Sequence, residues 1–203
     1  MVKKLNLYLN VENNGRSDLL IKLIAFDLVG VLAYENDYEL NELEDKIERL
    51  FGPNPNDEDF INKALSYINS REEISEMTSK IINNIYSVRD VNIISKIKEI
   101  RPDIRIAIVT NHVSTIHSWI EKMPLYGLLD GVFVSADLGC CKPDASFYQK
   151  VSEGMEVEKK DILFIDDSPK NIEGAKEYGM TTLLYNKTDD LFECVKKAIT
   201  NDL

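Results

Sequence analysis

Several features that mark secreted and membrane proteins are rare or missing in this sequence. Its 203 residues include only three cysteines, Cys140, Cys141 and Cys194, an odd number without the spacing of a disulfide framework or a zinc site. No stretch approaches the roughly 20 apolar residues that a membrane-spanning helix needs. The first ten residues, MVKKLNLYLN, alternate apolar and polar side chains and lack the apolar core of a signal peptide. We therefore expect reduced thiols, no membrane partner and a cytoplasmic location.

Positive charge is also scarce. Lysine and arginine number 24 against 35 aspartates and glutamates, which gives a formal net charge of −11. A chain this acidic repels the phosphate backbone of nucleic acids, so nucleic acid is not an expected partner. A site for a phosphorylated substrate would need its own local positive charge.

Predicted strands and helices alternate along most of the chain, and apolar residues make up 44% of it, enough for a sizeable core. This alternation is typical of right-handed βαβ crossovers, and it predicts an α/β fold with a doubly wound parallel sheet. Ser114 and Ser168 are the predicted N-caps of two helices. Gly154 and Gly179 are predicted to end two helices. The predicted strands are 19–26, 104–111, 131–136, 161–167 and 181–186; the predicted helices are 90–100, 114–122, 144–154, 168–179 and 189–200.

Residues 36–88 interrupt the alternation with three predicted helices and no convincing strand. The first helix carries an apolar stripe, and Ser70 and Glu73 have capping-box spacing before the third. We expect these residues to form a small α-helical cap inserted into a core made of residues 1–35 and 89–203. Within that core, residues 1–18 would add an extra strand and a turn. The sequence leaves the role of this strand and the oligomeric state open.

Polar residues follow the predicted core strands at the end where each strand stops. They are Asp27, the pair Thr110 and Asn111, and the pair Asp166 and Asp167, with Lys142 in a loop nearby. Open parallel sheets place their ligand sites outside the carboxyl ends of the strands, so these side chains are expected to converge. Each residue alone would be an ordinary turn former, helix cap or surface lysine. Because such polar residues recur at successive strand ends, together they indicate a ligand-binding site.

The chemistry of such a cluster is coherent. Carboxylates at close quarters repel one another and need a cation between them. All-oxygen ligation suits Mg²⁺, which takes one or two protein carboxylates together with substrate phosphate. Lys142 would add a second positive charge, and an aspartate free to attack phosphorus would form an aspartyl-phosphate.

The sequence resembles the haloacid dehalogenase-like (HAD) hydrolase superfamily. Its four motifs are matched by FDLVGVL, AIVTN, CCKPDASFY and ILFIDDSPKNIEGAKEYGM, and together they span residues 21 to about 185. The last motif is long and specific, and it fits the subgroup that has a small helical cap after the first motif. Its fitting positions are Asn171, Gly174, Ala175, Gly179 and Met180.

The resemblance implies a Mg²⁺ site and a nucleophile. Asp27 would be both the nucleophile and a metal ligand. The backbone carbonyl of Val29 would be a second ligand. Asp166 would bind the metal directly, and Asp167 directly or through water.

It also implies a phosphoryl site. Thr110 would donate a hydrogen bond to the phosphoryl oxygens, helped by the backbone amide of Asn111. Lys142 would neutralise the charge shared by the nucleophile and the phosphoryl group.

Val29 departs from the family pattern, which has a second aspartate there. In the family's phosphatases this aspartate protonates the leaving oxygen and then activates water. Without it, aryl and acyl phosphates should be better substrates than sugar phosphates, and the aspartyl-phosphate should accumulate. His112, Tyr34 and Glu35 are weak candidates for a substitute base. His112 and His117 are expected to be ordinary surface or partly buried histidines.

The favoured function is a Mg²⁺-dependent phosphohydrolase acting on a small phosphorylated metabolite. One alternative is a catalytically silent protein of the same fold that binds a phospho-ligand or a protein partner, as Val29 would suggest. Another is 2-haloacid dehalogenase chemistry, which needs no metal. The pair Asp166 and Asp167 and the lack of an arginine just after Leu32 argue against it.

Overall fold

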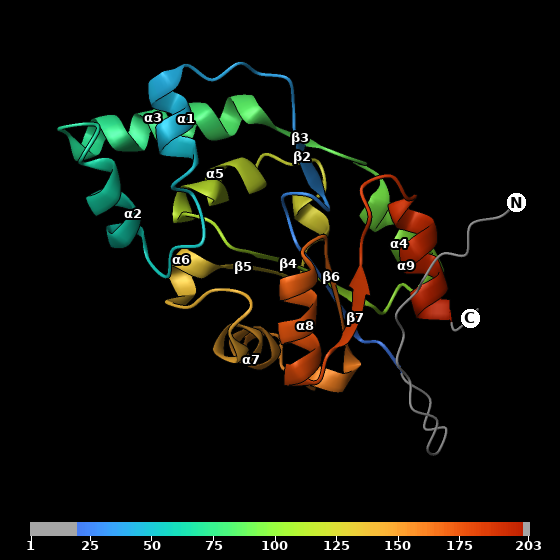
Figure 1. Ribbon diagram of the computed structural model, residues 1–203. Coiled ribbons are helices and arrows are strands. Elements are labelled where there is room, and N and C mark those ends of the chain that lie inside the picture. Colours follow the sequence, from blue (N-terminus) through green and yellow to red (C-terminus); the bar gives the residue numbers. More distant parts are fainter. Residues whose placement is uncertain (1–19, 201–203) are drawn as a thin grey trace, which may run out of the picture.

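A five-stranded parallel sheet forms the centre of the protein, as the computed structural model of residues 20–200 shows (Figure 1). The strand order is β5-β4-β1-β6-β7, so β1 is central and pairs with β4 on one side and β6 on the other. This order brings the carboxyl ends of β1, β4 and β6 side by side. The predicted strand at residues 5–11 lies outside the described residues. The strands are β1 Leu23–Phe26, β4 Arg105–Thr110, β5 Gly131–Val134, β6 Ile162–Asp166 and β7 Thr181–Leu184.

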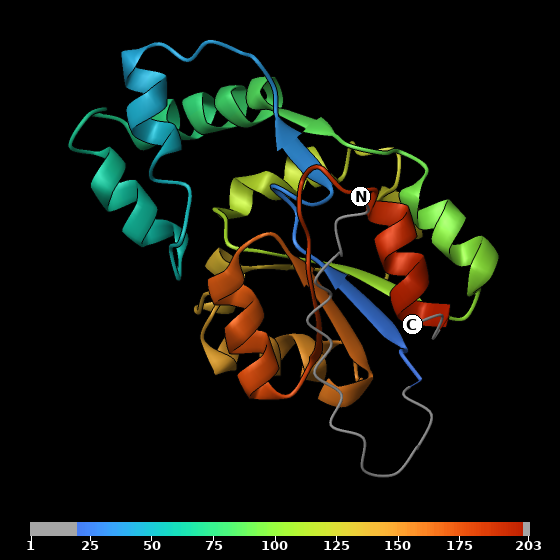
Figure 2. The ribbon, with the colours of Figure 1, turned by 45° about the vertical axis from the view of Figure 1, so that its right-hand side comes forward.

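Helices cover both faces of the sheet, which confirms the predicted doubly wound α/β fold (Figures 1 and 2). Along β1, Ile24 and Phe26 belong to one apolar cluster, together with residues of α4 (Ile93–Ile100) and α9 (Leu191–Thr200). Leu23 and Ala25 belong to a second cluster, together with residues of α7 (Ala145–Gly154) and α8 (Pro169–Tyr178). Successive side chains of a strand point to opposite faces, so one strand supplies both cores.

Three helices follow the first core strand and lie beyond one end of the sheet (Figure 2). They are α1 (Glu42–Glu48), α2 (Asp57–Ala64) and α3 (Arg71–Ile85), which we call the helical insertion. Asn41 and Glu44 form a complete capping box at the start of α1. At α3, Ser70 Oγ accepts a hydrogen bond from the Glu73 amide at 3.3 Å, as the spacing predicts.

Two short strands flank the helical insertion, although the sequence predicts no strand there. They are β2 (Ala33–Glu35) and β3 (Tyr86–Val88), which pair antiparallel with Tyr34 opposite Ser87. Three residues are too few for a periodic pattern. The pairing joins segments about 50 positions apart, so only the tertiary structure reveals this ribbon.

Some predicted helix ends are wrong. Ser114 does not cap a helix with its own side chain; it begins a 3₁₀ turn, and its amide donates to Oδ1 of Asp57 in the helical insertion at 2.9 Å. Gly154 is the last residue of α7 and Met155 follows as the cap. Gly179 ends α8 in the left-handed region, with φ of +108°, as predicted. The remaining short helices are η1 Ser114–Ile116, α5 His117–Ile120, η2 Tyr126–Leu128, α6 Ser135–Leu138 and η3 Lys159–Asp161.

Among the helices between residues 20 and 200, the longest is α3, with 15 residues. No helix between residues 20 and 200 is both long enough and apolar enough to cross a bilayer. The three cysteines are free thiols, and each is half-buried.

Candidate active site

The polar residues predicted at the strand ends do converge. Asp27 directly follows β1, while Thr110 and Asp166 are the last residues of β4 and β6. Lys142 arrives from the loop between α6 and α7. All four are buried, with exposed fractions of 8% for Asp27, 2% for Thr110, 3% for Lys142 and 0% for Asp166.

The ammonium group of Lys142 lies at the centre of this cluster. It donates to Oδ1 of Asp27 at 2.8 Å and to Oδ2 of Asp166 at 2.8 Å. A third bond goes to the carbonyl of Val109 at 3.0 Å. An ammonium has three hydrogens, so its donor capacity is fully used. Lys142 therefore acts here as a fixed charge between two carboxylates.

The loop that carries Lys142 is held by Asn111. The Asn111 side chain accepts from the Lys142 amide at 2.8 Å and donates to the Lys142 carbonyl at 2.9 Å. On the other side, α8 packs so closely that a Cβ on Gly174 would collide with the carbonyl of Pro143. The family resemblance implied a role for Asn111 only through its backbone amide, so this side-chain function was missed.

Asp27 presents two different oxygens. Oδ1 accepts from the Leu28 amide at 2.8 Å and from Lys142. Oδ2 has no hydrogen bond within residues 20–200, and it is not among the buried polar atoms, so it reaches solvent. One oxygen therefore fixes the orientation of the carboxylate and the other is free to bind or attack.

Asp166 is held rigidly by neighbours at the start of α8. Asn171 Nδ2 lies 3.2 Å from Oδ1 and 3.0 Å from Oδ2, and the Ser168 amide donates to Oδ1 at 2.8 Å. Ser168 precedes α8 as predicted, but its side chain makes no capping bond. Asn171 fitted the fourth motif without an assigned role. Its position one turn into the helix that follows Asp166 was the available signal.

Asp167 completes a group of three carboxylates. Oxygens of Asp27, Asp166 and Asp167 lie within 4.8 Å of one another. The Asp167 carboxylate occupies the space where Gly30 would carry a Cβ, and Gly30 has a φ of +102° that L-residues rarely adopt. Lys187 forms an ion pair with Asp167 at 3.0 Å. No pattern in the sequence pointed to Lys187.

The electrostatics of the cluster follow from its burial. Burial raises the pKa of Asp27 to about 7; Lys142 opposes this rise and Asp166 adds to it. Burial also lowers the pKa of Lys142, but Asp27 and Asp166 outweigh it, so the net shift is upward. Lys142 is therefore a stable cation, and the carboxylates around it still favour further positive charge.

The donor set fits a hard divalent cation. Three carboxylates from the ends of two strands, β1 and β6, offer one oxygen each within a small radius, with no nitrogen or sulfur among them. Mg²⁺ prefers such oxygen ligands, and it usually takes few from the protein. The residues that would hold it are Asp27, Asp166 and Asp167, and the carbonyl of residue 29 is the ligand that the family resemblance adds.

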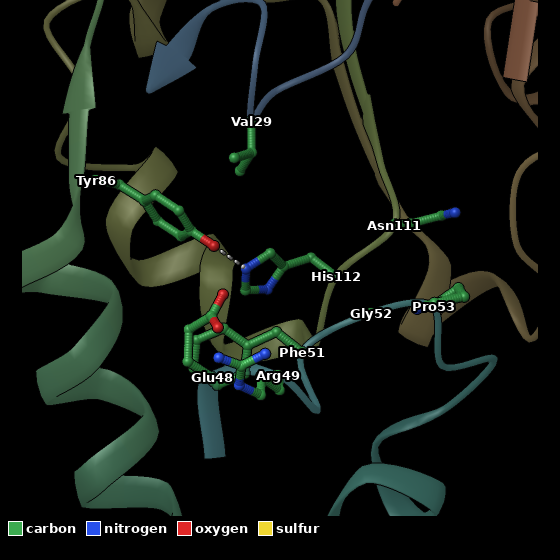
Figure 3. Close-up of a pocket in the computed structure, with 9 residues that line it drawn as sticks. All are labelled: Val29, Glu48, Arg49, Phe51, Gly52, Pro53, Tyr86, Asn111 and His112. Carbon is green, nitrogen blue, oxygen red and sulfur yellow. Dashed lines mark hydrogen bonds between the residues drawn. The ribbon is translucent and has the colours of Figure 1, made fainter. Parts of the chain in front are cut away.

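A pocket of about 280 Å³ opens beside this cluster, between the sheet and the helical insertion. Val29 and Asn111 line it from the core (Figure 3). His112 also lines it and is 98% buried, so the expectation of a surface or partly buried histidine was wrong. The physical reason is the helical insertion, which places Phe51 against the imidazole with ring centroids 5.1 Å apart.

His112 is neutral and paired with Tyr86. Burial lowers the pKa of His112 to about 4, and its Nε2 lies 3.2 Å from the Tyr86 hydroxyl (Figure 3). Its Nδ1 lies 3.3 Å from the carbonyl of Val113. The other suggested substitute bases, Tyr34 and Glu35, are exposed on β2 and do not line this pocket.

Comparison with known proteins agrees with this geometry. The model of the haloacid dehalogenase-like hydrolase family matches residues 24–185. The chain is 36% identical over 89 residues to the chloroplast flavin mononucleotide hydrolase 1 of Arabidopsis thaliana, covering 44% of this chain and 36% of that protein. It is 30% identical over 103 residues to a phosphatase of Mycobacterium tuberculosis, covering 50% and 48%. The chain thus spans less than half the length of each of these two relatives.

Solved structures share the fold across nearly the whole chain. A predicted HAD-like hydrolase from Porphyromonas gingivalis superimposes with a TM-score of 0.68 at 19% identity, covering 89% of this chain and 98% of that one. A HAD family enzyme from Bacteroides thetaiotaomicron, solved with magnesium and inorganic phosphate, gives a TM-score of 0.62 at 16% identity, covering 84% and 96%. Together with the match over residues 24–185, these findings show that the chain belongs to the haloacid dehalogenase-like hydrolase family.

Proposed function

We propose that this protein is a Mg²⁺-dependent phosphohydrolase that acts on a small phosphorylated metabolite through an aspartyl-phosphate on Asp27. The observation that carries the proposal is the group of three carboxylates, two of which bind the ammonium of Lys142. The relatives support it, since one is named a phosphatase and another a flavin mononucleotide hydrolase. A cytoplasmic location would fit the free thiols.

In the first step, Oδ2 of Asp27 attacks phosphorus and the bond to the leaving oxygen breaks. The leaving oxygen takes the electron pair and a proton from solvent, because Val29 has none to give. In the second step, a water oxygen attacks phosphorus and the bond to Asp27 breaks. Inorganic phosphate leaves, the carboxylate is restored, and the water's proton passes to solvent.

The surrounding residues stabilise charge during both steps. Lys142 keeps its place against Asp27 and offsets the negative charge that builds up between carboxylate and phosphoryl group. Thr110 and the amide of Asn111 are the proposed donors to the phosphoryl oxygens. A bound Mg²⁺ would supply electrostatic stabilisation of the same charge.

Val29 decides which substrates react well. General acid–base catalysis is worth roughly 10²–10⁴-fold, so its loss slows the reaction without abolishing it. A leaving group that is already a weak base needs no proton. We therefore propose that aryl and acyl phosphates react faster than alkyl phosphates, and that the aspartyl-phosphate accumulates.

The helical insertion is the proposed cap, within residues 36–88, over a core of residues 1–35 and 89–203. Asp57 of α2 binds the Ser114 amide, and Ser135 Oγ donates to the Asn54 carbonyl at 3.1 Å. Gly52 comes so close to the Asn111 carbonyl that a Cβ would lie 2.8 Å from it. These contacts support the proposal that the insertion is a cap, which would select the substrate.

A second candidate is a catalytically silent protein that binds a phospho-ligand, and Val29 is the observation in its favour. Dehalogenase chemistry is disfavoured by the three carboxylates, since a reaction that needs no metal gains nothing from them.

The test is hydrolysis of acetyl phosphate and p-nitrophenyl phosphate with and without Mg²⁺. Turnover should require Mg²⁺ and should be lost in Asp27→Asn. Asp103→Asn is the matched control, because Asp103 pairs with Arg101 just before β4, at the opposite end of the sheet. No turnover by the unmodified protein, together with binding of inorganic phosphate, would favour the silent candidate.

A further inference from the structure

The pocket is lined by Val29 and Asn111, which follow Asp27 and Thr110 in the chain, so a leaving group bound at Asp27 would extend toward it. Its wall includes Val29 and Asn111, which border the reacting centre, and it extends to Glu48 and Arg49 at the end of α1 (Figure 3). Its volume of about 280 Å³ lies just below the range of roughly 300–1,000 Å³ that drug-sized ligands occupy. The pocket therefore suits a leaving group smaller than a typical drug-sized ligand.

Most polar groups in the pocket wall already have partners. The Tyr86 hydroxyl is paired with His112 at 3.2 Å. Arg49 makes two bonds to Asp45, both at 2.9 Å, on the outer side of α1. The Glu48 carboxylate is the exception: it is half-buried, and it has no hydrogen bond or ion pair within residues 20–200.

The charge around Glu48 is negative. Burial raises the pKa of Glu48, Glu35 adds to the rise, and Arg49 only partly opposes it. The negative charge also affects Tyr86, whose pKa is raised first by burial and then by Glu48 and Glu35. The guanidinium of Arg49 therefore does not neutralise the pocket. A bound group would meet an unpaired carboxylate on the wall opposite Val29 (Figure 3).

We infer that the pocket selects a phosphate monoester whose small leaving group carries an ammonium ion, which Glu48 of the helical insertion binds. A half-buried carboxylate has lost part of its hydration, and a hydrogen-bond donor on the ligand compensates for that loss. A cationic donor forms a stronger hydrogen bond to it than a neutral donor does. A leaving group with a second anion would instead face Glu48 at close range and be rejected. This assignment rests on the proposed phosphohydrolase function, since it takes the phosphoryl group to lie at Asp27.

The experiment uses the full chain with Asp27→Asn, which cannot form the aspartyl-phosphate, in the presence of Mg²⁺. Calorimetry compares three esters of similar size: 2-aminoethyl phosphate, 2-hydroxyethyl phosphate and phosphoglycolate, which end in an ammonium, a hydroxyl and a carboxylate. The aminoethyl ester should bind about fivefold to tenfold more tightly than the hydroxyethyl ester, and phosphoglycolate should bind most weakly. Adding Glu48→Gln should bring the three affinities to within about twofold, since that amide carries no charge to discriminate among them.

The matched control is Glu42→Gln on the same helix. Glu42 is paired with Lys46 and its side chain is 85% exposed, so this change should leave the preference intact. Equal affinities for the three esters, tightest binding of phosphoglycolate through Arg49, or no binding at all would overturn the inference. So would an equal loss of preference in Glu42→Gln.

Turnover of acetyl phosphate by the unmodified chain separates this inference from the proposed function. Turnover with no preference among the esters would leave a phosphohydrolase whose pocket we have misassigned. An ammonium preference that Glu48→Gln removes, without any turnover, would support the pocket and contradict the hydrolase.

Discussion

The ammonium of Lys142 lies 2.8 Å from Oδ1 of Asp27, although 115 positions separate the two residues in the sequence. The side chain of Lys142 is 1% exposed and that of Asp27 is 11% exposed. The same ammonium bonds to Asp166, whose side chain is fully buried. The candidate nucleophile is thus part of a buried ion cluster that supports the fold as well as the chemistry.

Lys142→Met should destabilise the protein strongly. It leaves two buried carboxylates without their shared cation, a change that costs about 3–5 kcal/mol in comparable buried pairs. Denaturant unfolding measures the loss, which Mg²⁺ should reduce if it binds between the carboxylates. Lys160→Met is the control, because Lys160 forms a surface pair with Glu158 and should change the free energy of unfolding by less than about 1 kcal/mol. A similar small change in Lys142→Met would contradict the cluster.

Val29→Asp should raise turnover of alkyl phosphates far more than that of acetyl phosphate. The new carboxyl group would stand where a proton must reach the leaving oxygen, and restoring general acid catalysis is worth about tenfold or more. Steady-state rates on both substrates measure the effect. Val29→Asn is the control, because asparagine has nearly the same shape as aspartate but no acidic proton, and this variant should not raise the turnover of alkyl phosphates. Equal rates on alkyl and aryl phosphates in the unmodified protein, with no burst of leaving group, would show that Val29 does not limit the reaction.

Gly30→Ala should weaken Mg²⁺ binding and lower stability by about 1–3 kcal/mol. The added Cβ would collide with the Asp167 carboxylate, and alanine disfavours the φ of +102° at this position. Thermal unfolding with and without Mg²⁺ measures both effects. Gly127→Ala is the matched control, since no atom lies within 4 Å of its added Cβ and its φ is not positive. Equal Mg²⁺-induced stabilisation in the two variants would remove Asp167 from the metal site.

The contribution of His112 to stability should fall with acidification, opposite in sign to that of Asp27, whose pKa burial raises. The pKa of His112 is 6.5 when exposed and about 4 in the folded protein, so the unfolded chain binds more protons between these values. Stability from this group is therefore complete above pH 6.5 and is lost as the pH falls toward 4. Between pH 8 and pH 5 the loss is about 2 kcal/mol.

Denaturant unfolding of His112→Gln should lack this contribution, so that on going from pH 8 to pH 5 the unmodified protein loses about 2 kcal/mol relative to the variant. Tyr86→Phe removes the hydroxyl that bonds to His112 but keeps the buried imidazole, so it should retain the dependence. An unchanged slope in His112→Gln would show that another group is responsible.

The core elements were predictable because their signals are local. Buried strands such as Ile162–Asp166 are continuous apolar runs, and Gly179 ends its helix through a backbone conformation that glycine adopts freely. The ribbon of β2 and β3 was missed because three-residue strands carry no periodicity. The cap at Ser114 was wrong because its acceptor, Asp57, belongs to another part of the chain.

The candidate site divides in the same way. Residue pattern is enough to predict which polar residues stand at strand ends, since Asp27, Thr110 and Asp166 each end an apolar run, and parallel strands bring those ends together. The sequence also shows that position 29 lacks an acid. These are properties of residue identity and of the sheet's topology.

The way those residues are held, and what faces them, depends on the packing of the folded chain. Asn111 fixes the Lys142 loop, Asn171 orients Asp166, and Glu48 lines the pocket with no hydrogen bond or ion pair to any residue between 20 and 200. Each of these roles depends on the packing of segments that are far apart in the chain, namely a helix against a loop or the helical insertion against the sheet. A side chain acquires such a role from its distance to a partner in space, and no local pattern encodes that distance.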